Sequence, residues 1–146
     1  MPLRFKIQVG APPQQVFDIV SDIANHGAWA NPSAGLEVKP VSGGPTQVGS
    51  TFKSSQKFAG KHTGADIKVT RLAAPSALAF DAVQAGKKPV CFTNTFTLTP
   101  TADGTLVERS IDAKPANPLA IVFYPAIRAD AMKSLRNLKA KAERAR

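Results

Sequence analysis

Residues 11–20 read Ala-Pro-Pro-Gln-Gln-Val-Phe-Asp-Ile-Val, and they directly follow an alternating apolar series, Leu3, Phe5, Ile7 and Val9. Alternation with a period of two predicts a strand with one buried face. Pro12 and Pro13 suit the first turn of a helix, where a missing N–H costs little. The apolar stripe that follows consists of Val16, Phe17, Ile19, Val20 and Ile23. This stretch therefore predicts a strand that passes at once into a short helix ending near Asp22.

The chain after this junction reads as a second short helix and then a series of strands. The short helix covers residues 23–30 and carries Trp29, and Asn31-Pro32 ends it because the residue before a proline avoids the α region. Strand patterns follow, separated by connectors rich in glycine, proline and aspartate, which favour bends. We expect antiparallel strands over residues 36–41, 49–58, 65–72, 77–84, 89–99 and 105–113.

A long terminal helix closes the chain. Asn117 is a suitable N-cap with Pro118 at the first helical position, and Pro125 predicts a kink or a separate preceding helix. An apolar stripe at spacings of three and four is expected to face the apolar side of the sheet. Its members are Tyr124, Ile127, Ala131, Leu135, Leu138 and Ala142.

Composition is that of a single globular domain. The chain has 146 residues, 43% of them hydrophobic, and no run approaches the roughly 20 apolar residues that cross a bilayer. The first residues alternate in polarity where a signal peptide needs an apolar run, so we expect a cytoplasmic protein. One cysteine, Cys91, and two histidines without zinc-site spacing predict no metal site. Motifs for nucleotide binding or a serine nucleophile are absent from the sequence, and no cofactor is expected.

The net charge of +9 is concentrated at the carboxyl end. Residues 128–146 contain seven basic and two acidic side chains, which is +5 of the total. A basic helix face could bind an anionic surface or an acidic partner, although a charged face also simply keeps an amphipathic helix soluble. Nucleic acid is not expected, because the strands lack exposed, interleaved aromatic side chains.

The order of elements is a helix-grip arrangement, an α+β fold in which a curved antiparallel sheet is covered by two short helices and a long C-terminal helix. Three segments carry a family resemblance: residues 11–22 with Trp29 shortly after, Val-Gly-Ser-Thr-Phe at 48–52, and Phe-Thr-Leu-Thr-Pro with Asp-Gly-Thr within 96–105. The whole chain resembles the START-like superfamily, with its Bet v 1-type, polyketide cyclase/dehydrase-like and coenzyme Q-binding members. The resemblance implies a cavity for a hydrophobic ligand between sheet and terminal helix.

Strand parity nominates the residues that would line such a cavity. They are Trp29, Phe52, Phe58, Ile67, Val69, Phe80, Phe92, Phe96, Val107, Tyr124 and Ile127. The alternative for each of them is ordinary core packing. Polar residues on the same parity are more informative, because a buried polar group is costly unless it is hydrogen-bonded. These are Ser54, Gln56, Asn94 and Arg109. A β-bulge near Arg109 would instead turn its side chain to solvent.

Two readings of chemistry remain open at this level. One is a binding protein for a small hydrophobic or amphipathic ligand. The other is a cofactor-independent cyclase, aromatase or dehydratase in which Asn94 and Arg109 orient a carbonyl and Tyr124 or His26 moves a proton. His26 is expected to be a surface loop residue, because no carboxylate partner stands at a fixed spacing. Asp81 and Asp112 fall on the solvated parity of their strands.

Overall fold

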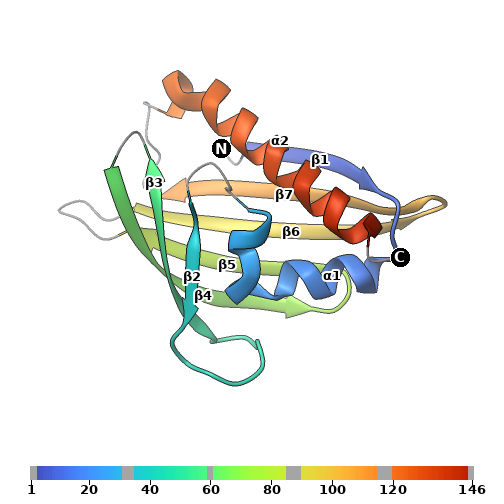
Figure 1. Ribbon diagram of the computed structural model, residues 1–146, viewed down its shortest axis with the longest axis horizontal. Helices are drawn as coiled ribbons and strands as arrows, with labels where there is room; N and C mark the ends of the chain where they lie inside the picture. Colours follow the sequence, from blue (N-terminus) through green and yellow to red (C-terminus); the bar gives the residue numbers. More distant parts are fainter. Residues whose placement is uncertain (1–2, 31–34, 59–60, 85–89, 115–119, 145–146) are drawn as a thin grey trace.

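The structure is a computed structural model that describes residues 3–30, 35–58, 61–84, 90–114 and 120–144. Seven antiparallel strands form one curved sheet, as expected for a helix-grip fold (Figure 1). The elements in chain order are β1 (Leu3–Val9), α1 (Pro13–Ser21), the 3-10 helix η1 (Ile23–Ala28), β2 (Glu37–Pro40), β3 (Thr51–Phe58), β4 (Lys61–Ala73), β5 (Ala77–Gln84), β6 (Val90–Thr101), β7 (Gly104–Lys114) and α2 (Ala120–Arg144).

The sheet order is β1-β7-β6-β5-β4-β3-β2, so the first strand pairs with the last. All of these pairs are antiparallel, with Leu3 opposite Ile111 and Val9 opposite Thr105 at the two ends of the β1–β7 pair. The concave face is covered by α2 on the side of β1 and β7, and by α1 and η1 over the middle (Figure 1). This arrangement brings the beginning and the end of the chain into one core.

The junction that opens the fold is held by backbone and side-chain contacts. Pro12 is extended, and its carbonyl accepts from the N–H groups of Gln15 and Val16, which starts α1. The buried Thr105 Oγ1 donates to the Ala11 carbonyl at 2.7 Å. Gly104 in the β6–β7 turn has φ +143°, and a Cβ atom there would lie 2.3 Å from the Val9 carbonyl oxygen. Only glycine permits this approach of the turn to β1.

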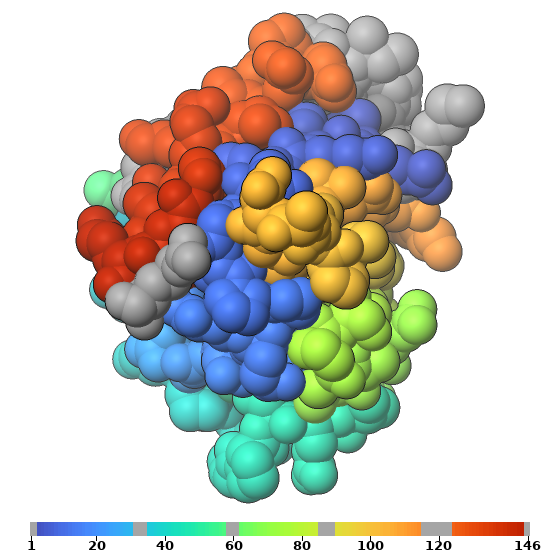
Figure 2. Space-filling view, turned by 90° about the vertical axis from the view of Figure 1, so that its right-hand side faces the viewer, coloured from blue at the N-terminus to red at the C-terminus, as the bar shows by residue number. Residues whose placement is uncertain are grey.

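The helix α2 is fixed at its C-terminal end. Gln15 Nε2 donates to the Ala142 carbonyl at 2.9 Å, and the Gly10 N–H donates to Glu143 Oε2 at 3.1 Å. In this half of the helix, Leu135, Leu138 and Ala142 are completely buried. Figure 2 looks onto this end, where the last turns of α2 lie against α1, and the β6–β7 turn lies on the other side of the N-terminal segment. We call this the closed end of the molecule.

The N-terminal half of α2 differs from the expectation. The helix is continuous through Pro125, so no separate preceding helix exists within Ala120–Arg144, and the expected cap at Asn117 and Pro118 lies outside the described residues. Tyr124 was expected to face the sheet, but it is 39% exposed. Ile127 is half-buried, and the stripe becomes fully covered only from Ala131 onward.

Side chains on the concave face of the sheet are likewise more buried at the closed end than at the opposite end. At the closed end, side chains such as Val9, Leu98 and Val107 are buried completely or almost so. At the opposite end, inward-facing side chains of β3 to β7 are only half-buried (the left of Figure 1). We call this set the open end: Ser54, Gln56, Ala65, Ala82, Phe92, Ile111 and Ala113.

Most strands match their sequence expectation within two residues. The exception is β4, which begins at Lys61 rather than near Ala65. The two glycines within 59–64 predict a bend over this connector. Gly64 instead pairs with Ser55 inside the ladder, so the pairing of β4 with β3 begins earlier in β4 than the sequence suggested.

Candidate functional site

Asn94 and Arg109 form a buried polar pair at the boundary between the core and the open end. Asn94 lies on β6 opposite Ile111, and Arg109 lies on β7 opposite Phe96, with no register shift along this pair of strands. The alternative of a bulge near Arg109 is therefore wrong. Asn94 is 6% and Arg109 8% exposed, and Arg109 Nη2 donates to Asn94 Oδ1 at 3.0 Å. Strand parity correctly predicted that both point inward.

Aromatic rings surround this pair. The Arg109 guanidinium carbon lies 5.5 Å from the centroid of the Phe96 ring, a cation–π contact. Trp29 meets Phe96 edge-on with centroids 6.0 Å apart. His26 meets Trp29 at 4.9 Å and Phe80 at 5.9 Å. These four rings connect η1 with β5 and β6 beneath the polar pair.

His26 is a correction to the sequence reading, which placed it at the surface. It is 4% exposed, and its Nε2 lies 2.7 Å from the Val20 carbonyl oxygen. Because a carbonyl can only accept, Nε2 carries the proton and Nδ1 does not. Burial lowers the pKa of His26 to about 4; the hydrogen bond to Val20 opposes this shift and the positive charge of Arg109 adds to it. His26 is therefore neutral at neutral pH, and its partner is a backbone carbonyl that no side-chain spacing reveals.

Two buried donors find no acceptor among the residues that the structure describes. They are Trp29 Nε1 and Arg109 Nε, and both side chains pack on Phe96. A buried donor without an acceptor costs about 1 to 3 kcal/mol, so native cores rarely retain one without a reason. A polar atom placed beside Arg109 would satisfy at least one of them.

Asp130 of α2 is the acidic group that acts on Arg109. Burial lowers the pKa of Arg109 to about 10, and the negative charge of Asp130 works in the opposite direction. Partial burial raises the pKa of Asp130, while Arg109 and Lys133 lower it. The sequence reading missed Asp130. Its position three residues after Ile127 on the apolar stripe was the signal that could have found it.

The other nominated residues fall into three groups. Trp29, Phe52, Ile67, Val69, Phe80, Phe96 and Val107 are buried members of one apolar core. Ser54, Gln56, Phe92 and Ile127 are half-buried, while Tyr124 is exposed. The side chain of Phe58 lies outside what the structure describes. Asp81 and Asp112 are half-buried on the outer face of the sheet, where Thr93 Oγ1 donates to Asp81 Oδ1 at 2.7 Å.

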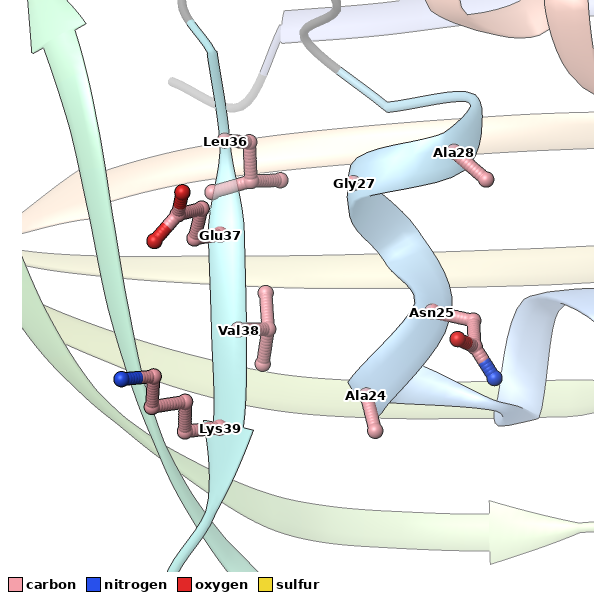
Figure 3. Close-up of a pocket in the computed structure, with 8 residues that line it drawn as sticks. All are labelled: Ala24, Asn25, Gly27, Ala28, Leu36, Glu37, Val38 and Lys39. Carbon is pink, nitrogen blue, oxygen red and sulfur yellow. The ribbon is translucent and has the colours of Figure 1, made fainter.

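Two surface hollows lie near η1. One, of about 320 Å³, separates η1 from β2; Val38 points toward η1, whereas Glu37 and Lys39 point away (Figure 3). At Gly27 the helix η1 and the chain at Leu36 approach each other closely, because a Cβ atom on Gly27 would lie 2.4 Å from the Leu36 carbonyl oxygen. The other, of about 230 Å³, is walled by Trp29 with Asp18 and Asp22, and by Lys141 of α2.

Within the described ranges, no three His, Cys, Asp or Glu side chains are grouped so that they could hold a metal ion. Among the helices described, none combines the length and the apolar character needed to cross a membrane.

Comparison with known proteins places the chain. Residues 3–143 match the family described as polyketide cyclase / dehydrase and lipid transport. The chain belongs to this family. No curated protein matches it.

Several solved structures share the fold of this chain at low sequence identity. Protein MLL2253 from Mesorhizobium loti superimposes with a TM-score of 0.77 at 16% identity, covering 100% of this chain and 99% of that one. The Zhui aromatase/cyclase from Streptomyces sp. R1128 gives 0.74 at 12% identity, covering 99% and 94%. Major latex-like protein 151 from Panax ginseng gives 0.70 at 14%, covering 97% of each. The START-like, Bet v 1-like resemblance drawn from the sequence is confirmed.

Proposed function

We propose that this family member binds one small amphipathic molecule at the open end of its concave face. The apolar body of the molecule would lie on half-buried side chains such as Phe92, Ala82 and Ile111. Its polar group would meet Arg109 and Asn94. The proposal rests above all on the buried Nε of Arg109, a donor without an acceptor among the described residues. An acceptor oxygen on the ligand would remove the cost of leaving it unpaired.

The half-buried character of the open end supports the same proposal. Apolar side chains that remain partly exposed on a concave surface lose more solvent contact when a ligand covers them. Phe92 is the largest such side chain here, and it lies two residues from Asn94 on β6. Phe96, in contrast, is almost completely buried and makes its contacts within the protein.

The test is a titration with the neutral fluorophore N-phenyl-1-naphthylamine. We expect saturable uptake at one molecule per chain, weakened about tenfold by Phe92→Ala because roughly 1.4 kcal/mol of apolar contact is lost. Val83→Ala is the matched control: Val83 is an exposed apolar residue on β5, on the outer face of the sheet. It should leave the affinity unchanged. Uptake that does not saturate, or equal effects of both substitutions, would contradict the proposal.

A cyclase or dehydratase is the second candidate, favoured by the family description and by the neutral imidazole near Arg109. An efficient general base has a pKa near the working pH, and that of His26 lies about 4. Tyr124, the other candidate for moving a proton, is 39% exposed. Turnover of a poly-β-ketone mimic that is lost in Arg109→Ala while fluorophore binding survives would establish the enzyme. Binding without turnover supports a carrier.

A further inference from the structure

Arg109 carries a buried positive charge, and no described residue provides a counter-charge in contact with it. Its one hydrogen bond to a described side chain goes to Asn94, a neutral amide. Ion pairs within the described part of the chain join Lys6 to Glu108 and Lys139 to Glu143, and Arg109 takes part in neither. A guanidinium is normally satisfied by a carboxylate or phosphate, which can accept from two of its N–H groups at once.

The described groups around Arg109 do not supply that negative charge in contact. The neighbour over which the guanidinium carbon lies, at 5.5 Å from the ring centroid, is the uncharged Phe96, and His26 is a neutral imidazole. Asp130 interacts with Arg109 only through its electric field, because no hydrogen bond or ion pair joins them. Asp130 is half-buried on the part of α2 where the helix is least covered. Arg109 is thus balanced at a distance by a half-buried carboxylate of α2, which directly precedes the core residue Ala131.

We propose that the ligand is an amphipathic anion whose carboxylate or phenolate pairs with Arg109, and that Asp130 is the specificity-determining residue that competes with it. This inference rests on the proposed function and names its ligand class. An anion at Arg109 Nε would take the place of the distant carboxylate as counter-charge. It would also be repelled by Asp130, which would limit its affinity.

The test compares two displacers of bound N-phenyl-1-naphthylamine that have the same chain length, dodecanoate and dodecan-1-ol. The wild-type protein should prefer dodecanoate. Asp130→Asn removes the competing charge and should tighten dodecanoate binding about tenfold, as expected for like charges roughly 6 Å apart at an effective dielectric constant near 40, with dodecan-1-ol unaffected. Because Asp130 is half-buried at the surface, this variant should fold.

Asp112→Asn is the matched control. It makes the same charge change on the strand that carries Arg109, but on the outer face of the sheet. It should leave both displacement constants unchanged. Arg109→Met, checked for folding by its unfolding temperature, should abolish the preference for dodecanoate.

The outcomes separate the two proposals. If both displacers bind equally in wild type and in Asp130→Asn, the protein is a binder of amphipathic molecules but the anion inference is wrong. If Asp112→Asn acts like Asp130→Asn, the effect is one of overall charge, and Asp130 has no special role. If neither displacer nor the fluorophore binds, the proposed function itself is wrong and this inference falls with it.

Discussion

The direction in which the side chains of Arg109 and His26 point depends on the local backbone around each of them. Regular strand parity was enough to predict that Asn94 and Arg109 point inward, because the β6–β7 ladder has no register shift. Parity does not apply to η1, where the direction of a side chain depends on one short turn. His26 therefore looked like a surface residue, although its Nε2 bonds the Val20 carbonyl within the core.

Burial of His26 predicts how stability depends on pH. Its folded-state pKa of about 4 lies below the ordinary 6.5, so the unfolded chain takes up the proton first. The stability that neutral His26 contributes is complete above about pH 6.5 and is lost as the pH falls toward 4. The full loss is of the order of 3 kcal/mol.

Urea unfolding of the wild type and of His26→Gln between pH 7.5 and 4 measures this effect. The contribution of Asp130, whose raised pKa has the opposite sign, is common to both proteins and cancels in the difference. We expect the wild type to lose more stability than the variant as the pH falls. Parallel profiles would show that His26 is not held neutral.

At the scale of elements, sequence and structure agree where the pattern is local. The 77–84 strand was predicted with its observed bounds, because sequences that favour bends flank it at 74–76 and 85–88. The start of β4 was missed because pairing with β3 overrides the bend tendency of Gly64. The open end could not be predicted either, because half-burial depends on how α2 lies across the sheet, and parity says nothing about that.

Gly104 provides a prediction for the turn between β6 and β7. Gly104→Ala should destabilise the fold by several kcal/mol, because its φ of +143° is strained for alanine and the new Cβ would collide with backbone atoms of Val9 and Ala11. Gly43→Ala is the control, since Gly43 also has a positive φ of +67° but has nothing within 4 Å of a built Cβ. It should cost about 1 kcal/mol. Equal losses in thermal unfolding would argue against close packing of the turn on β1.

For the whole molecule, the excess positive charge and the candidate site lie on different surfaces. Arg136 and Arg144 are exposed on α2, away from its buried stripe. Reversing both to glutamate lowers the formal net charge from +9 to +5. Retention on a cation exchanger should fall, while fluorophore affinity and unfolding temperature stay the same, because exposed charges contribute little to either. A matching loss of fluorophore affinity would place the ligand on the basic face.

Burial decreases from the closed end to the open end, so the residues at the two ends contribute differently to the stability of this one domain. Leu138, Val107 and Val9 hold the architecture, and replacement there removes cohesion that the rest of the chain cannot restore. Ala82, Phe92 and Ile111 are only half-buried, so substitutions there should lower the free energy of unfolding less. Substitutions at the open end can therefore change which ligand the protein prefers, while the closed end keeps the fold intact.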